Sequence, residues 1–505
     1  MPWPITANAS TALPSLLSSV PQLEPALRLL RREDHGASGT FISNGQSTTA
    51  EHVSVCTMSR TERCDLSGMA PDSPWLVRPG GKTRCIFTTT TPYQFEVIRG
   101  DRDKLLLFFQ GGGACWDEPS TSFPACSTGA FPQGTRGGVF DRANPDNPFR
   151  AYTIAHVLYC DGSVFGGNVT RQYRDPSGSP VRQAGYENAR SVLDWVYGQQ
   201  AAAGTLASPL ASLVVSGCSA GSIGAQIWAD HALNRLPHVA AAVVPDSYAG
   251  VPSPRAGGGG HGSRVFPSSG EGTLIAELGF CSSPLLAPLP AHLREACLAR
   301  TLSLHAVTAA VTARYGAVAF AHVQSKTDDV QQAFNVALSA ARSIEPSGCF
   351  DAETCFTGPD RLYAATNDYF ELYNAAPNHV HFFVQSSEHC YLPNDLVYTA
   401  DPSGASGGGG GGGGGGPRLV EWLGRLPLRP GSNASIETRC EGAERARVRW
   451  WVPGARYCDA RLASKTFVAP GTVVAGGGRR DGSGASGRRR DGGEGVGDAA
   501  TRSDR

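Results

Sequence analysis

The stretch Ser212–Gly221, SLVVSGCSAG, decides how this chain folds. An apolar run leads into GCSAG at residues 217–221, and an amphipathic segment, Ser222–Asn234, follows directly. This order predicts a buried strand, a tight turn and a helix, with Ser219 on the turn. Glycines two residues before and after the serine leave room where a strained turn would reject larger side chains. The pattern favours Ser219 as a nucleophile raised above a sheet, and a tight turn with an inert serine is the alternative.

A second glycine-rich segment, QGGGACW at residues 110–116, follows the apolar run Lys104–Phe109. Glycines there would leave backbone N–H groups free to face a negatively charged oxygen, as in the loop that accompanies a serine elbow in esterases. The N–H of Ala220, next to the serine, would be the partner donor. A plain glycine-rich turn is the alternative. A phosphate-binding loop is disfavoured because no Gly-Lys-Ser/Thr follows.

A serine nucleophile requires a histidine base, expected late in the chain in the order serine, acid, histidine. The histidines after Ser219 are His231, His238, His261, His292, His305, His322, His379, His381 and His389. Of these, only His389 comes just beyond a strong apolar run, Val380–Val384. His379 and His381 lie at the start of that run or within it, where core or solvent positions are expected. The sequence therefore favours His389 as the base.

The sequence gives a weaker indication of the acidic residue that would orient the histidine. Asp328 and Asp329 follow a strand-like AVAFAHVQS and precede a helical DVQQAFNVAL, so they lie at a strand end, where the acid usually stands. Asp246 ends the strand that follows the nucleophile and is an alternative. An aspartate at that place could equally cap a helix or brace a loop. Chain order alone puts Asp328 modestly ahead.

Apolar runs alternate with helix-like segments from about Cys56 to Ala400, which is the pattern of a parallel sheet. The expected strands are Lys104–Phe109, Ile154–Tyr159, Ser212–Val215, Val239–Val244 and Val380–Val384. The expected helices are Glu187–Ala201, Ser222–Asn234, Leu293–Tyr315, Asp329–Ile344 and Leu419–Leu426. We therefore predict an α/β-hydrolase-like fold, with a mostly parallel central sheet and helices on both faces.

Composition divides the 505 residues into three parts. Residues 1–49 are rich in Ser, Pro and Ala and are expected to form a poorly ordered leader. Residues 50–470 are expected to form the catalytic domain, with a glycine-rich insert at 403–417. Residues 471–505 are rich in Gly, Arg and Asp, with almost no apolar side chains, and are expected to be a disordered tail.

The 14 cysteines include no Cys-x-x-Cys pair, so neither a zinc site nor a redox dithiol is indicated. Their scattered placement fits up to seven disulfides and an oxidising compartment. Residues 1–39 lack the compact apolar run of a signal peptide, which conflicts with that interpretation, and we give the cysteines more weight. Equal numbers of basic and acidic residues, 44 each, favour no nucleic-acid partner. No apolar stretch approaches the roughly 18–20 residues of a membrane span.

Six segments together resemble one known family. They are FQGGGACWD (109–117), LYCDGSVFGGN (158–168), VVSGCSAGS (214–222), VPDSYAG (244–250), HVQSKTDDVQQ (322–332) and SSEHC (386–390). This set is similar to the pectin acetylesterases, a family that includes the Wnt deacylase Notum, and the resemblance spans roughly 64–426. It implies an α/β-hydrolase-like fold and a triad of Ser219, Asp328 and His389. Asp246 falls on a family segment outside the triad.

The resemblance also implies an oxyanion hole formed by the backbone N–H groups of Gly112, Gly113 and Ala220. It implies hydrolysis through an acyl-enzyme without metal or cofactor. Notum-like members carry a bulky Trp at the position of Gly113. A side chain that helps to wall a lipid pocket is therefore missing here, which weakens the case for a fatty-acyl substrate. The expected function is a secreted serine carboxylesterase that deacetylates pectin or a related polysaccharide. The alternatives are lipid or protein O-deacylation, or a catalytically inactive binding protein.

Two cysteine environments are expected near these segments. Cys115 and Cys126 flank the loop after the glycines and should form a disulfide that makes the loop rigid. Cys218 lies inside the elbow and is expected to be disulfide-bonded or buried rather than to act as a second nucleophile.

Overall fold

The computed structural model describes residues 53–87, 92–122, 125–251, 270–341, 359–400, 417–426 and 435–437. The predicted leader 1–49 and tail 471–505 lie outside these ranges, and so does the glycine-rich insert 403–417 except for its last residue.

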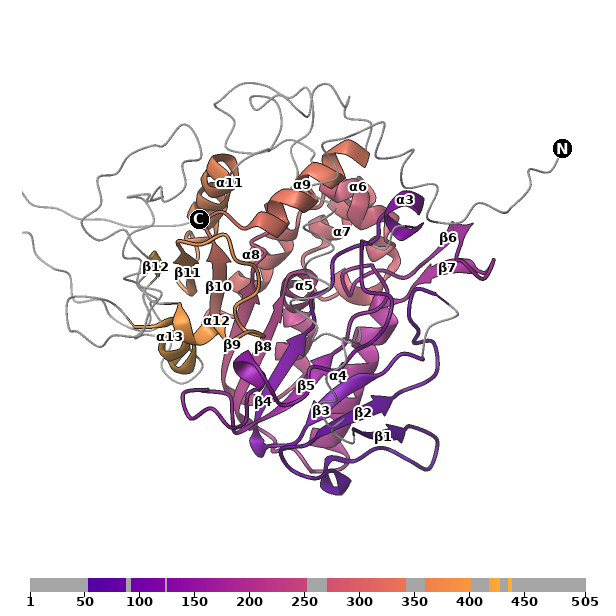
Figure 1. Ribbon diagram of the computed structural model, residues 1–505, viewed down its shortest axis with the longest axis vertical. Helices are drawn as coiled ribbons and strands as arrows, with labels where there is room; N and C mark the ends of the chain where they lie inside the picture. Colours follow the sequence, from indigo (N-terminus) through magenta and orange to yellow (C-terminus); the bar gives the residue numbers. More distant parts are fainter. Residues whose placement is uncertain are drawn as a thin grey trace, which may run out of the picture. The chain divides into compact units, whose positions relative to one another are not determined.

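A mostly parallel sheet is the centre of the described structure (Figure 1). Its strands are β1 (Ser54–Thr57), β2 (Pro74–Arg78), β3 (Phe95–Ile98), β4 (Asp101–Phe109), β5 (Tyr152–Val157), β8 (Leu210–Cys218), β9 (His238–Asp246), β10 (Ala319–Ser325), β11 (His379–Val384) and β12 (Ile436–Glu437). They lie in the order β1-β2-β3-β5-β4-β8-β9-β10-β11-β12. Strand β3 is antiparallel to both of its neighbours, whereas every pairing from β5 to β12 is parallel. This is the predicted α/β-hydrolase arrangement.

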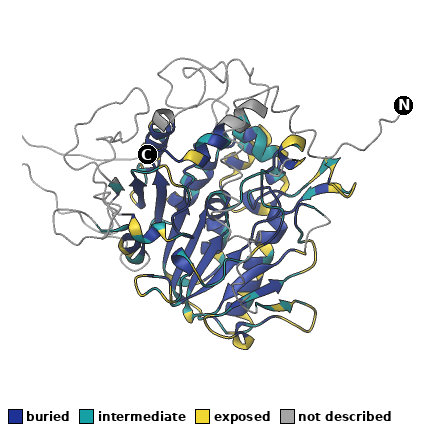
Figure 2. Cartoon of the chain, in the orientation of Figure 1, coloured by how far each residue is buried: buried dark blue, intermediate teal, exposed yellow. Residues whose placement is uncertain are grey.

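The central strands form where the sequence is apolar on both faces, and Figure 2 shows them mostly in the colour of buried residues. Alternate residues of β4 enter two different clusters: Leu105 and Leu107 pack in one, and Leu106 and Phe108 in the other. Burial of each such side chain contributes about 1.5–3 kcal/mol. The sheet therefore has a core on each face, as a strand without polar alternation requires.

Helices cover both faces, as predicted. Residues of α4 (Gly185–Ala201), α5 (Ala220–Arg235), α7 (Ala291–Leu298) and α8 (Leu304–Arg314) join the first core, and those of α12 (Leu396–Thr399) and α13 (Leu419–Arg425) join the second. Helix α9 (Asp329–Ala341) begins at the predicted residue, and α11 (Pro359–Tyr373) packs on β11. The remaining α-helices in the described ranges are α3 (Glu118–Ser122) and α6 (Gly270–Glu277).

Two predictions about these elements were incomplete. The helix expected over Leu293–Tyr315 is two helices, because the backbone of Arg300 takes a positive φ of 60° and Ser303 caps the start of α8. Strands β1 to β3, and the hairpin of β6 (Val169–Arg174) and β7 (Pro180–Gln183), were not predicted, since their apolar runs are short.

The parallel pairing brings the carboxyl ends of several strands to one edge of the sheet. Phe109 pairs with Gly217, Cys218 with Asp246, and Ser325 with Val384. In open α/β sheets, ligands bind outside this edge. The segments after β4, β8, β10 and β11 are those in which the sequence predicted functional residues.

Candidate active site

Ser219 lies on the turn between β8 and α5, with φ 59° and ψ −122°. A non-glycine residue in this region is strained, and such strain is typical of a nucleophile elbow. A Cβ atom at Gly217 would lie 2.6 Å from the carbonyl oxygen of Phe109, and one at Gly221 would collide with the same oxygen. The two glycines are thus required because the turn packs directly against the end of β4.

His389 and Asp328 meet at the ends of two neighbouring strands, β11 and β10. Nδ1 of the imidazole lies 2.7 Å from Oδ2 of Asp328, and the two side chains are 4% and 0% exposed. Asp328 also accepts hydrogen bonds from the backbone N–H of Gln331, at 2.9 Å, and from its side-chain amide, at 2.9 Å. The carboxylate therefore caps α9 and orients the imidazole at the same time, with Nδ1–H as donor and Nε2 left as the basic nitrogen.

A disulfide joins the segment that carries the serine to the segment that carries the histidine. Cys218 precedes Ser219, Cys390 follows His389, and the two cysteines are bonded with their Cα atoms 5.5 Å apart. A ring nitrogen of His389 lies within 4.8 Å of both sulfur atoms. The prediction that Cys218 is disulfide-bonded is confirmed, although the sequence did not indicate its partner.

Asp246, the alternative acid, has a different set of partners. Its carboxylate is buried and accepts hydrogen bonds from the backbone N–H groups of Tyr391, at 2.8 Å, and Leu392, at 2.7 Å. Burial raises the pKa of Asp246 to about 6, and the hydrogen bonds and the charge of His389 act in the opposite direction. It is thus Asp328, not Asp246, that contacts the imidazole nitrogen.

The glycine loop lies beside the elbow. A Cβ atom at Gly111 would be 3.4 Å from Cβ of Ser219, while Gly112 and Gly113 take positive φ values of 143° and 70°. The loop is held by hydrogen bonds from the N–H of Ala114 to the Ala125 carbonyl, at 3.0 Å, and from the N–H of Ser127 to the Gly112 carbonyl, at 2.8 Å. These two bonds hold the loop through the N–H of Ala114 and the carbonyl of Gly112, and they do not use the N–H groups of Gly112 and Gly113.

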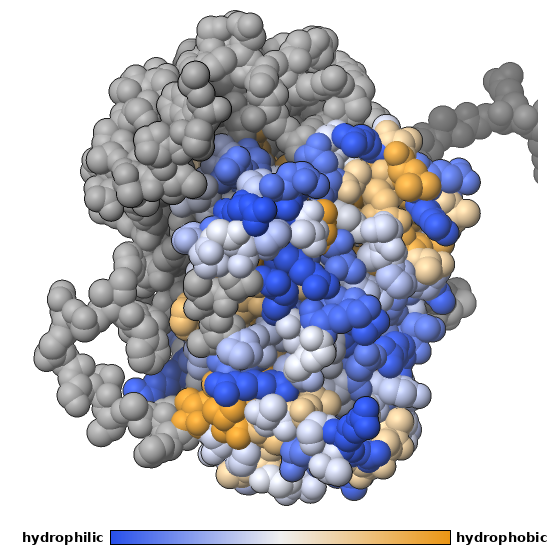
Figure 3. Space-filling view, turned by 90° about the vertical axis from the view of Figure 1, so that its right-hand side faces the viewer, coloured by the Kyte–Doolittle hydropathy of each residue, from blue (hydrophilic) through white to orange (hydrophobic). Residues whose placement is uncertain are grey.

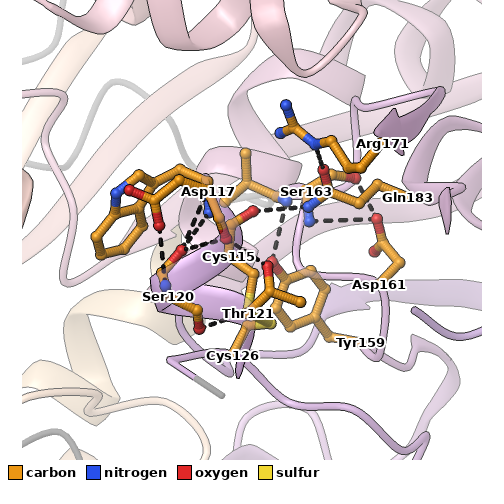
Figure 4. Close-up of a disulfide and its surroundings, with 12 residues drawn as sticks. Cys115, Asp117, Ser120, Thr121, Cys126, Tyr159, Asp161, Ser163, Arg171 and Gln183 are labelled. Atoms are coloured by element: carbon orange, nitrogen blue, oxygen red, sulfur yellow. Dashed lines mark hydrogen bonds between the residues drawn. A yellow bond between two sulfur atoms is a disulfide. The ribbon is translucent and has the colours of Figure 1, made fainter. Parts of the chain in front are cut away.

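The predicted disulfide between Cys115 and Cys126 is present at the base of this loop (Figure 4). The side-chain amide of Gln183 donates to the Cys115 carbonyl at 2.7 Å, and Arg171 donates to Gln183 at 2.7 Å. The hydroxyl of Ser120 accepts from two backbone N–H groups within the loop. The loop is therefore held on one side by the disulfide and on the other by hydrogen bonds from the β6–β7 hairpin.

An aromatic side chain occupies the space beside Gly113. A Cβ atom there would collide with the Ala125 carbonyl and would lie 3.2 Å from Cζ of Phe334, which comes from α9. The ring of Phe334 meets that of Trp116 edge to face, with centroids 6.3 Å apart. The backbone thus requires glycine at position 113, and the absence of a side chain there does not leave an empty wall.

Two clusters of potential metal ligands occur in the described part of the chain, and each contains the two cysteines of one disulfide. Disulfide sulfur atoms are not the thiolates that bind metals, so neither cluster is a suitable metal site. Within the described ranges, no helix combines the length and apolar character needed to cross a bilayer. On the face shown in Figure 3, hydrophilic residues cover much of the surface between smaller groups of hydrophobic ones.

The comparison with protein-family models agrees with the motifs. Residues 82–253 match the model of the pectinacetylesterase family. No curated protein sequence matches the chain. The structure of the Wnt deacylase Notum from Drosophila is similar at 14% identity, covering 71% of this chain and 96% of Notum, with a TM-score of 0.46. A hyperthermophilic esterase from the archaeon Pyrobaculum calidifontis is similar at 13% identity, covering 55% of this chain and 73% of the esterase, with a TM-score of 0.23.

The matched segment includes the glycine loop and Ser219, and it ends before Asp328 and His389. The family match supports an enzyme that removes O-acyl groups by ester hydrolysis. Residues 82–253 are therefore similar to the pectinacetylesterase family, and the resemblance indicated by the sequence motifs is confirmed.

Proposed function

We propose that this chain is a serine carboxylesterase with Ser219 as nucleophile, His389 as base and Asp328 as the acid that orients the base. The observation that carries the proposal is the 2.7 Å contact between His389 and Asp328, on a loop joined by a disulfide to the residue before Ser219. An imidazole held in one tautomer near a strained serine is the arrangement that acyl transfer needs.

The mechanism follows from these positions. Oγ of Ser219 attacks the ester carbonyl carbon while Nε2 of His389 takes the hydroxyl proton, and Asp328 stabilises the imidazolium that forms. The backbone N–H groups of Gly112, Gly113 and Ala220 stabilise the oxyanion, and loss of one such donor typically costs about 10²–10³-fold in rate. The protonated histidine then gives its proton to the leaving alcohol, and water hydrolyses the acyl-enzyme with His389 as base.

We infer that the acyl group is short. Phe334 lies beside the glycine loop, where a side chain at position 113 would project. The ring of Phe334 packs edge to face against the ring of Trp116. An acyl chain that extends from Ser219 past position 113 would meet these rings. Acetyl fits this limit better than a fatty acyl chain.

We infer that the substrate is an O-acetylated polysaccharide such as pectin, in an oxidising, extracellular environment. The family match supports this substrate class. The described residues include five disulfides, between cysteines 56 and 64, 85 and 160, 115 and 126, 218 and 390, and 281 and 297. Proteins of reducing compartments rarely keep so many.

The test is hydrolysis of p-nitrophenyl acetate, butyrate and palmitate, followed by acetate release from acetylated pectin. We expect acetate to be the best of the three esters, and Ser219→Ala to lower kcat/KM by at least about 10⁴-fold. A preference for palmitate would instead support lipid or protein deacylation. Equal activity of wild type and Ser219→Ala would reject the nucleophile, and no activity at all would favour an inactive binding protein.

A further inference from the structure

The loop that carries His389 is held by three consecutive backbone hydrogen bonds to the end of β9. Ser247 Oγ accepts from the N–H of Cys390 at 2.9 Å, and Oδ2 of Asp246 accepts from the N–H groups of Tyr391 at 2.8 Å and Leu392 at 2.7 Å. Ser247 Oγ in turn donates to the other oxygen of Asp246 at 2.9 Å. One carboxylate and one hydroxyl thus satisfy the backbone directly after the histidine.

The same aspartate also contacts the nucleophile segment. The carbonyl oxygen of Asp246 accepts the N–H of Ser219 at 3.0 Å, and Asp246 pairs with Cys218 in the sheet. Cys390 has a positive φ of 66°, a backbone conformation that needs support from its surroundings. Asp246 therefore binds both of the segments whose separation must be correct for proton transfer from Ser219 to His389.

We propose that Asp246 is a positioning residue, which holds the His389 loop against the nucleophile strand and whose negative charge favours the protonated imidazole. This role rests on the ester hydrolysis proposed above. It differs from the role of Asp328, because Asp246 acts on the backbone of the loop and through space, without a hydrogen bond to the ring.

The charges around Asp246 give the expected pH dependence. Burial raises the pKa of Asp246 to about 6, and the charged groups near it are His389 and, bonded to the imidazole, Asp328. Tyr391 also faces it, but burial raises the pKa of that phenol, which stays neutral. Above about pH 6 Asp246 is ionised, so all its oxygen lone pairs are available and its charge stabilises the protonated imidazole. Below that pH both effects are lost.

The experiment compares Asp246→Asn and Asp246→Ala with wild type in kcat, KM and the pH profile of acetate ester hydrolysis. The asparagine can still accept both backbone N–H groups with Oδ1, so it removes the charge and keeps the two hydrogen bonds to the His389 loop. Its NH2 group would donate to Ser247 Oγ, which reverses the direction of the Ser247 bond. We expect Asp246→Asn to lower kcat by roughly tenfold and to leave KM within twofold of the wild-type value. The acid limb, the fall in rate on the acidic side of the pH profile, should move to lower pH. Asp246→Ala also leaves buried N–H groups without an acceptor, so a loss of roughly 100-fold is expected.

Asp230→Asn is the matched control, because Asp230 is another buried aspartate. Its partners are Arg314, the last residue of α8, and Tyr315, which follows that helix. If Asp246→Asn leaves both kcat and the acid limb unchanged, or changes them only as much as the control does, the positioning role is rejected. If Asp246→Ala fails to fold, the asparagine variant decides. If wild type shows no hydrolysis that depends on Ser219, the proposed function itself fails, and the role of Asp246 fails with it.

Discussion

The segments that carry Ser219 and His389 are built in opposite ways. The Ser219 turn is local: its shape depends on Gly217 and Gly221, which lie two residues away on each side and pack on the end of β4. The His389 loop depends on distant partners. Cys390 is bonded to Cys218, 172 residues earlier, and the N–H of Tyr391 reaches a carboxylate 145 residues earlier.

This difference has a consequence for function. The glycines that the Ser219 turn requires lie next to it in the sequence, whereas the residues that place the His389 loop lie far away in the chain. Changes on the histidine side should therefore lower the rate while Ser219 keeps its own backbone geometry. The predictions below test this contrast, beginning with the largest effect.

Loss of the charge on Asp328 should have the largest effect on the histidine side. Asp328→Asn keeps the cap on α9 but favours the wrong imidazole tautomer, so we expect kcat to fall by about 10⁴-fold. Steady-state kinetics with p-nitrophenyl acetate measures this change. Asp329→Asn is the control, because that residue is adjacent in the chain but exposed. Equal losses in the two variants would contradict the assignment of Asp328.

Removal of the disulfide between Cys218 and Cys390 should have an intermediate effect. In the chain-entropy model, a loop of 172 residues corresponds to about 5 kcal/mol of stability at most. We expect the double variant Cys218→Ser/Cys390→Ser to lower Tm and to lower kcat by roughly tenfold, since Asp246 and Ser247 still hold the loop.

Thermal unfolding and kinetics of this double variant should be compared with Cys281→Ser/Cys297→Ser, which removes a disulfide of separation 16 outside the site. The control should lower Tm with little change in kcat. An unchanged kcat in the Cys218 and Cys390 variant would mean that the covalent bond does not place His389.

The smallest effect is a change in selectivity at Phe334. Phe334→Ala removes the ring beside Gly113, so the ratio of kcat/KM for butyrate to that for acetate should rise by roughly tenfold. Tyr197→Ala, an aromatic truncation on the exposed surface of α4, should leave the ratio unchanged. A constant ratio in Phe334→Ala would show that the ring does not limit acyl length.

The fold could be predicted where the sequence has long apolar runs. The five expected strands all exist. Strands buried on both faces are mostly apolar along their length and are therefore easily recognised. Strands β1 to β3 were missed, since each has only four or five residues and no strong periodicity. The break near Arg300 was missed because the flanking residues alone give a continuous helical pattern.

The site shows the same division between local and distant information. The elbow and the glycine loop each carry a local motif, so their structure followed from the sequence. The pairing of Cys218 with Cys390 and the contacts of Asp246 depend on which strands lie side by side, and no short motif encodes that. The capping pattern of Asp328 and Gln331, an acidic residue followed three positions later by Gln, is a signal that could have strengthened the choice of acid.

The most direct test of the account is covalent labelling with a fluorophosphonate, with the modified residue located by peptide mass spectrometry. We predict one adduct, on Ser219, that is absent in Ser219→Ala and forms much more slowly in His389→Ala. An adduct on another residue, or labelling of Ser219→Ala at the wild-type rate, would contradict the assignment of Ser219 as the nucleophile.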